Sequence, residues 1–116
     1  MDLENFSTQS FKVLDDIPRF VENESFASPF GLQWNAFRKA QLDSYTGTSM
    51  SEERVSTALQ VPLESIKGLR VLEAGSGAGR FTEILLKYGA IVYSFDLSDA
   101  VSANYKNNMP NKDLTI

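Results

Sequence analysis

The sequence contains neither cysteine nor histidine, and these two absences exclude several kinds of chemistry at once. Disulfides, thiol nucleophiles, the common zinc and haem ligands and the Ser-His and Cys-His relays are all ruled out. No run of lysine or arginine occurs, and the formal net charge is −4, so the long-range attraction to nucleic acid or anionic membranes is also lacking. We therefore expect no metal site, no nucleic acid and no membrane as partner.

The sequence shows neither the pattern of a secretory signal peptide nor that of a membrane span. The stretch "MDLENFSTQSFKVL" carries acids where a signal peptide has a basic stretch followed by an apolar one, and no run approaches the ~18 apolar residues of a membrane span. A cytoplasmic location is the expectation, and the lack of cysteine agrees with it. The 116 residues, 42% of them apolar, suffice for one small globular core.

Residues 1–30 are turn-rich and are expected to form an extended N-terminal arm. Within them "SFKVLDDIPRFV" alternates weakly, turns at Asp15-Asp16 and contains Pro18, which pushes Ile17 out of the helical region. The pattern favours a short hairpin or an arm along the domain surface.

Residues 31–66 are expected to form two short helices that lead into the sheet. The first spans "LQWNAFRKAQLDSY", with Trp34 and Phe37 interpreted as core residues. The second begins in a capping box of Ser49 and Glu52 and stops near Pro62, after which "LESIKG" adds one turn.

Residues 67–116 change period and alternate between strand and helix patterns. The strand "LRVLEA", expected to be buried on both faces, is followed by the helix "RFTEILLKYG", where Gly89 is placed for a C-terminal cap. The strand "AIVYSFD", a helix capped by Ser98 and a third strand at "DLTI" follow. Such alternation predicts an α/β fold with a parallel sheet in the order β-α-β-α-β.

A glycine-rich turn, Gly75-Ser76-Gly77-Ala78-Gly79, follows the first of these strands, where parallel sheets bind ligands. Glycine permits backbone angles closed to other residues and lets a ligand approach the main-chain N–H groups. Glu73 and Asp96 end the first two strands, and we expect both carboxylates to point into one crevice. An acid at the second strand tip is where dinucleotide folds hold a ribose diol. The spacing is E-x-G-x-G-x-G, not G-x-G-x-x-G, and no P-loop Gly-Lys-Ser/Thr follows.

This stretch resembles motif I of the S-adenosylmethionine-dependent methyltransferases with the class I Rossmann-like fold, and "VYSFDLSDAV" resembles their second-strand motif. The resemblance implies the first half of a Rossmann-like sheet. In it the loop of Ala74, Gly75, Ser76, Gly77 and Gly79 lies under the methionine part of the cofactor. By the same resemblance Glu73 orders the loop and approaches the amino group, Asp96 accepts hydrogen bonds from the ribose hydroxyls, and Leu97 lies beside the adenine.

The segment "IPRFVENESFASPFGLQWNAFRKAQLDSYTG" is similar to the lead-in of a bacterial group of these enzymes whose N-terminal zinc-ribbon-like module is here reduced and without cysteine. In such enzymes the helices before the first strand often cover the cofactor. Arg38 and Gln41 would then reach the cofactor carboxylate, although we interpret them as solvated helix positions.

The resemblance covers residues 67–116, whereas a complete fold of this family has seven strands. We favour an expressed fragment of a longer enzyme over a half-protein that pairs with another chain or a domain without chemistry. The expected activity is methyl transfer to a small-molecule acceptor, and no catalytic residue is assigned. The alternatives are an NAD(P)-linked oxidoreductase fragment and a non-catalytic interaction domain. An uncovered third strand would leave a sheet edge open, which predicts a homodimer or strand exchange.

Overall fold

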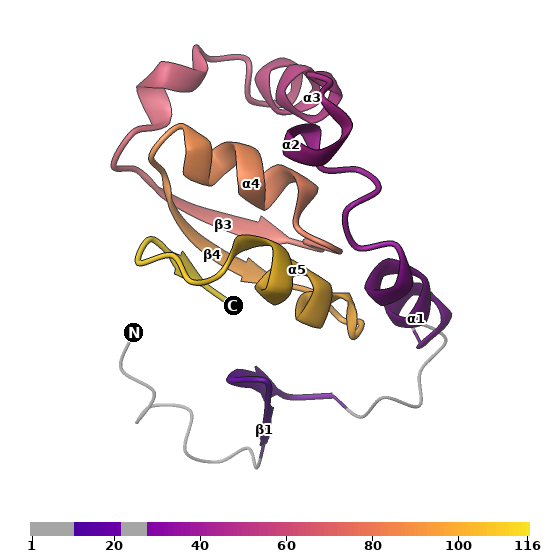
Figure 1. Ribbon diagram of the computed structural model, residues 1–116. Helices are drawn as coiled ribbons and strands as arrows, with labels where there is room; N and C mark the ends of the chain where they lie inside the picture. Colours follow the sequence, from indigo (N-terminus) through magenta and orange to yellow (C-terminus); the bar gives the residue numbers. More distant parts are fainter. Residues whose placement is uncertain (1–10, 22–27) are drawn as a thin grey trace.

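The structure, a computed structural model, describes residues 11–21 and 28–116. These residues form a mixed α/β arrangement with a three-stranded parallel sheet, five α-helices, one 3-10 helix and a separate two-stranded hairpin (Figure 1). In chain order the elements are β1 (Lys12–Leu14), β2 (Ile17–Arg19), α1 (Ser28–Ala36), α2 (Asp43–Thr46), α3 (Met50–Leu59), the 3-10 helix η2 (Leu63–Ile66), β3 (Arg70–Ala74), α4 (Arg80–Lys87), β4 (Ile91–Phe95), α5 (Ala100–Asn108) and β5 (Leu114–Thr115). None of the helices in the described ranges has the length and apolar character needed to cross a bilayer.

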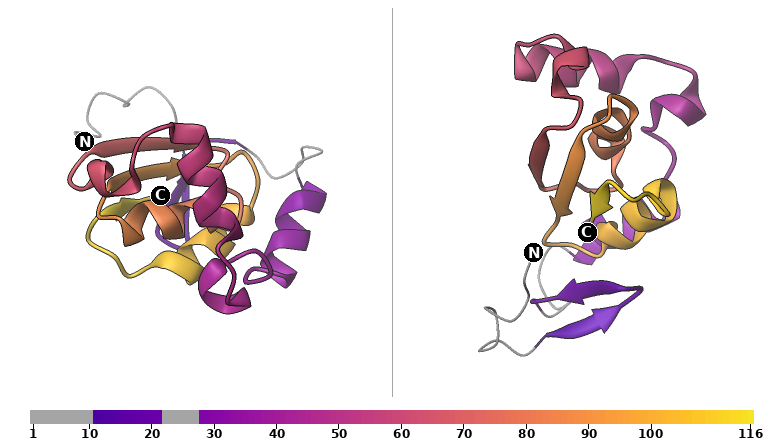
Figure 2. Two further views of the ribbon diagram at one scale, coloured as in Figure 1. Left: turned by 90° about the horizontal axis from the view of Figure 1, so that it is seen from above. Right: turned by 90° about the vertical axis from the view of Figure 1, so that its left-hand side faces the viewer.

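The parallel sheet has the strand order β3-β4-β5, as the alternating pattern predicts. Strands β3 and β4 pair over five residues, from Arg70 opposite Ile91 to Ala74 opposite Phe95, whereas β5 pairs with β4 over two residues. Figure 2 shows helices α4 and α5 on the same face of the sheet. Successive right-handed crossovers that step in one direction place their helices on one face.

Strand β3 is covered on one face only, and the expectation that it is buried on both is wrong. Val71 packs against the core, whereas the side chain of Leu72 is 72% exposed. Because α4 and α5 share one face, alternate residues of β3 and β4 project from the other face. This open face carries Leu72 and Ala74 of β3 and Phe95 of β4, all exposed.

The core lies between the covered face of the sheet, helix α4 and the lead-in. Its buried apolar residues are Val55, Leu63, Ile66, Ile84, Leu85, Ala90, Val92 and Leu114. Val55 comes from α3 and Leu63 and Ile66 from η2, so the lead-in contributes to the same core as the sheet. The expected turn at "LESIKG" is confirmed as η2, and Gly89 ends the α4 segment with φ +80° as a C-terminal cap requires.

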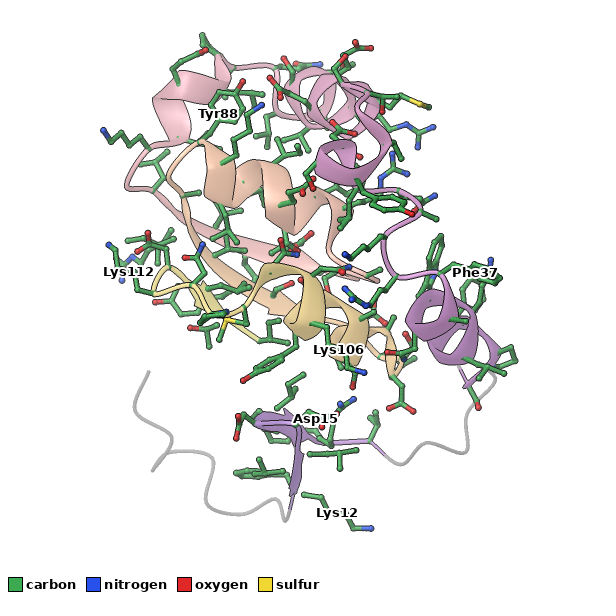
Figure 3. The ribbon with its side chains drawn as sticks, in the orientation of Figure 1. Lys12, Asp15, Phe37, Tyr88, Lys106 and Lys112 are labelled. Carbon is green, nitrogen blue, oxygen red and sulfur yellow. The ribbon has the colours of Figure 1, made fainter. Side chains whose placement is uncertain are left out.

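The lead-in contains three α-helices, not the expected two. The helix predicted over residues 32–45 is interrupted: α1 already begins at Ser28 and ends at Ala36, and α2 begins only at Asp43. Between them the Arg38 carbonyl accepts a hydrogen bond from the Asn107 side chain of α5 (2.7 Å). The Arg38 guanidinium also donates to Asn107 (2.7 Å), so α5 fixes the segment between α1 and α2 through a contact that the amphipathic pattern does not reveal. Phe37, labelled in Figure 3, is 65% exposed and is not a core residue.

Helix α3 begins as predicted near Ser49, but the capping box does not form. The Ser49 hydroxyl donates to Glu53 (2.6 Å), and the first amides of α3 are capped by Asp43, which accepts hydrogen bonds from Ser51 N and Glu52 N at 3.0 Å each. Burial raises the pKa of Asp43, but these two hydrogen bonds, together with the Ser51 side chain and the charge of Arg80, hold that pKa below its ordinary value. The N-terminal cap of α3 therefore comes from Asp43, which lies outside the stretch in which a capping-box pattern is read.

The described part of the N-terminal arm is the hairpin of β1 and β2, with its turn at Asp15 and Asp16. It is fastened to α5: Arg19 donates to Asp99 (3.1 Å) and to Ser102 (2.8 Å), and Ile17 is 3% exposed. Figure 3 shows Asp15 on the side of the hairpin that faces α5. The rest of the expected arm, residues 1–10 and 22–27, lies outside the described residues.

Candidate functional site

The glycine loop leaves the carboxyl end of β3 and turns directly into α4. Gly75, Gly77 and Gly79 have φ of +73°, +54° and +87°, the left-handed region that favours glycine. The amides of Gly75 and Ser76 both donate to the Phe95 carbonyl at the end of β4 (2.9 and 3.1 Å). The loop is therefore joined to the end of the neighbouring strand.

The three glycines of this loop differ in how much space surrounds them. A Cβ at Gly75 or Gly77 would meet nothing within 4 Å. Glycine is therefore favoured at these two positions by the positive φ and not by crowding, and the surface above them is open. A Cβ at Gly79 would lie 2.2 Å from Asn104 Oδ1 and 2.4 Å from Asn108 Nδ2. Gly79 thus lets α4 approach α5, whereas Gly75 and Gly77 leave the backbone accessible.

A cavity of about 300 Å³ lies at the carboxyl ends of β3 and β4. Its lining residues are Phe30, Trp34, Gly75, Gly77, Asp96 and Ser98. They come from α1, from the glycine loop and from the loop between β4 and α5. This is the edge of a parallel sheet where ligands bind, and the volume matches the lower end of small-molecule sites.

Asp96 is the carboxylate of this cavity. Its Oδ2 accepts a hydrogen bond from Gly77 N (2.8 Å), and its Oδ1 accepts from the amide and the hydroxyl of Ser98 (2.8 and 2.7 Å). A carboxylate offers about four lone-pair positions. Three protein donors fix its orientation and leave acceptor capacity for a hydroxyl-bearing ligand.

Glu73 does not line the cavity, contrary to the expectation that both acids point into one crevice. In the alternation of β3 its side chain shares the covered face with Val71, and Oε2 accepts hydrogen bonds from Thr82 (2.5 Å) and Ser94 (2.8 Å). Its Oε1 is buried and has no hydrogen-bond partner among the described residues. Burial raises the pKa of Glu73, and the nearby charge of Asp96 adds to this effect.

The network beneath Glu73 continues into α5. The fully buried Asn104 donates to Thr82 and Ser94 (3.1 and 3.2 Å), and its Oδ1 accepts from Asn108 (2.8 Å), which also donates to the Gly79 carbonyl (3.1 Å). Strand end, glycine loop and α5 are thereby held in one polar cluster. Such a cluster fixes the position of the loop.

Helix α1 forms the aromatic wall of the cavity through Phe30 and Trp34. The Asn35 side chain donates to the Asp99 carbonyl (2.9 Å), and Gly31 is packed so closely that a Cβ would lie 2.9 Å from Asp99 Cβ. Sequence reasoning missed Phe30 and Ser98 as lining residues and placed Trp34 in the core. The i, i+4 spacing of the two aromatics was the available signal, but it is equally typical of a core face.

The remaining candidate residues do not line the cavity. Ala74 is exposed at the end of β3, Ser76 is buried at the start of the turn, and Leu97 is 58% exposed beside Asp96. Arg38 is not free for a ligand carboxylate, because its guanidinium donates to Asn107 (2.7 Å). Gln41 is exposed, as interpreted from the sequence, but it lies in a turn between α1 and α2 and not on a helix.

Comparisons of the chain with protein-family models, with curated proteins and with solved structures found no match. Within residues 11–21 and 28–116 no three acidic side chains gather as a metal site would require. The chemistry of the site is therefore inferred from its own residues.

Proposed function

We propose that this chain is the cofactor-binding half of an S-adenosylmethionine-dependent methyltransferase with a Rossmann-like fold. The observation that supports it most directly is the cavity in which Gly75, Gly77 and Asp96, from two adjacent strand ends, meet the aromatic wall of α1. A small-molecule acceptor and a cytoplasmic location belong to the same proposal, since the acidic composition disfavours nucleic acid.

The residues present fit the chemical parts of this cofactor. Asp96 keeps about one free acceptor position for a ribose hydroxyl beside its three protein donors, and the open backbone at Gly75 and Gly77 admits a ligand without a Cβ in its way. Glu73 lies outside the cavity, and its contribution is to order the end of β3 through its hydrogen bonds with Thr82 and Ser94. Trp34 and Phe30 offer faces to a flat base.

S-Adenosylmethionine, when bound, supplies a methyl group already activated on a sulfonium. The chain's own contribution is to bind and orient it: Asp96 fixes the sugar, the glycine loop sets the depth of approach, and the wall of α1 excludes water from one side. Alignment in a water-poor site can supply much of the acceleration of a displacement at carbon. No residue of this chain is needed as a base for that role.

The test is a titration with S-adenosylhomocysteine, followed by calorimetry and by the fluorescence of Trp34, the only tryptophan in the chain. We expect saturable heat and a change in Trp34 emission with the same midpoint. Asp96→Asn keeps one oxygen acceptor for the loop but loses the negative charge, and should weaken binding at least tenfold, about 1.4 kcal/mol.

Glu64→Gln is the matched control, because it removes the same charge at an exposed position of η2, which precedes β3 and so lies away from the strand ends that form the cavity. It should leave binding unchanged. NADH, titrated in the same way, should give no saturable signal; saturable NADH binding without S-adenosylhomocysteine binding would favour the oxidoreductase alternative. A folded chain that binds neither ligand contradicts a cofactor site in this chain.

A further inference from the structure

Asn107 of α5 connects the glycine loop with the segment that follows α1. Helix α5 lies beside both α1 and α4 (Figure 1). The amide nitrogen of Asn107 donates to the Ala78 carbonyl in the loop (2.8 Å) and to the Arg38 carbonyl just after α1 (2.7 Å). Its oxygen accepts a hydrogen bond from the Arg38 guanidinium (2.7 Å). Asn107 is half-buried and does not line the cavity.

The connection uses both donors and the acceptor of the Asn107 side chain. A primary amide has two N–H donors and one oxygen. One donor goes to each carbonyl, and the oxygen faces the guanidinium, which can only donate. Aspartate has the same shape but no donor, and leucine has neither donor nor acceptor. Among side chains of this size, asparagine alone can hold both carbonyls at once.

Both ends of the connection lie close in sequence to residues that line the cavity. Ala78 is adjacent to Gly77, and Arg38 follows the last turn of α1, which carries Trp34. Gly77 and Trp34 both line the cavity. A shift of one carbonyl relative to the other would therefore change the space between the loop and the aromatic wall of α1.

Other contacts fasten each of these segments to α5 separately. Asn108 donates to the Gly79 carbonyl (3.1 Å), and Asn35 donates to the Asp99 carbonyl (2.9 Å). Among the residues that the structure describes, only Asn107 forms hydrogen bonds both with residues 75–79 and with residues 37–42. Its loss should leave the loop and α1 in place but no longer fixed relative to each other.

We propose that Asn107 is a positioning residue for the cavity: by holding the carbonyls of Ala78 and Arg38 on one amide group, it sets the distance between the glycine loop and the wall of α1. The inference rests on the cofactor site proposed above and deepens it, because the fit of the ligand between Gly77 and Trp34 then depends on a side chain that does not touch it. Residues without ligand contact change such coupling by roughly 2- to 30-fold.

Two variants break the connection in different ways. Asn107→Asp keeps the oxygen that faces Arg38 but has no donor for either carbonyl, whereas Arg38→Met keeps both carbonyl hydrogen bonds and loses the guanidinium. Asn107→Asp should raise the dissociation constant of S-adenosylhomocysteine about tenfold and Arg38→Met about threefold. Lys39→Met is the matched control, because it removes the same charge from the adjacent, exposed position. It should leave the dissociation constant unchanged.

A double-mutant cycle separates positioning by Asn107 from a direct ligand contact of Arg38. In an Asn107→Leu background the connection is already broken, so adding Arg38→Met should not weaken binding further. A direct contact between Arg38 and the ligand would instead lose the same factor in both backgrounds. An equal loss in both backgrounds would overturn the proposal.

Measurements on the ligand-free chain distinguish positioning from stability alone. Arg38→Met should shift the Gly77 amide resonance in nitrogen-15 spectra and change Trp34 emission, and both effects should be absent in the Asn107→Leu background. Circular dichroism identifies the variants that fold; if Asn107→Asp does not, Arg38→Met decides by the same readouts. A folded Asn107→Asp with wild-type affinity and an unshifted Gly77 resonance overturns the proposal. If wild-type protein binds no S-adenosylhomocysteine but Arg38→Met still shifts Gly77 through Asn107, the connection is supported and the proposed cofactor is wrong.

Discussion

The loop that carries the site offers a test in which two glycines, both with positive φ (+54° at Gly77 and +87° at Gly79), differ in how closely other side chains surround them. Gly77→Ala and Gly79→Ala each place a side chain at positive φ, which costs about 1–2 kcal/mol. At Gly77 the new Cβ meets nothing within 4 Å, so this backbone term is the whole expected effect.

At Gly79 the new Cβ would also displace Asn104 Oδ1 and Asn108 Nδ2, which lie 2.2 and 2.4 Å from its ideal position. Asn104 is fully buried and held by Thr82 and Ser94, so it cannot turn away without breaking other hydrogen bonds. Loss of the Asn108 hydrogen bonds to Asn104 and to the Gly79 carbonyl adds about 1 kcal/mol each. Gly79→Ala should therefore be about 2 kcal/mol less stable than Gly77→Ala.

Urea unfolding followed by circular dichroism measures this difference, and thermal unfolding should show a gap of roughly 8 °C at about 4 °C per kcal/mol for a chain of this size. Asn108→Ala in the Gly79→Ala background should recover part of the loss, since one of the two crowded atoms is removed. If Gly79→Ala is no less stable than Gly77→Ala, the packing of the loop on α5 is not as described.

Three further predictions follow from the contacts around the site. Asp43→Ala should lower the free energy of unfolding by about 1 kcal/mol because it removes the cap of α3, while Ser49→Ala changes it by only about 0.3 kcal/mol, as urea titrations would show. Arg19→Met should release the hairpin from α5 and speed amide exchange in residues 12–19 by roughly 30-fold, the equivalent of about 2 kcal/mol, with exchange in β4 unchanged. Burial raises the pKa of Glu73, so the native state binds more protons than the unfolded state above the ordinary value of 4.5, and this residue's contribution to stability falls as pH rises toward the folded pKa. Glu73→Gln removes that contribution and should gain stability relative to wild type as pH rises above 4.5; a difference that does not change with pH above that value would contradict a raised pKa.

The site owes its geometry to α5 as much as to the motif residues. Asp99, at the start of that helix, accepts from Arg19 with its side chain and from Asn35 with its carbonyl, so the hairpin and the aromatic wall are fastened to the same residue. Neither Arg19 nor Asn35 lies in the cavity. Substitution of either residue is therefore expected to change ligand affinity through the position of α1 and not through lost ligand contacts.

The sequence by itself determined the parts of this protein that depend on neighbouring residues. The strand and helix order of residues 67–116, the turn at η2, the left-handed cap at Gly89 and the juxtaposition of the glycine loop with Asp96 all follow from local periodicity and from the topology of parallel sheets. These features need only the chain's own pattern, because backbone angles and side-chain alternation are set over a few residues.

The tertiary structure decided the features that depend on contacts between distant segments. It broke the helix expected over residues 32–45, replaced Ser49 by Asp43 as the cap of α3, and turned Glu73 toward Thr82 and Ser94 instead of the cavity. It also placed Phe30 and Trp34 in the wall of the site. Periodicity shows that a residue is apolar and on one face of its element, but which neighbour covers that face, and which distant side chain claims a carbonyl or an amide, is determined only when the elements pack together.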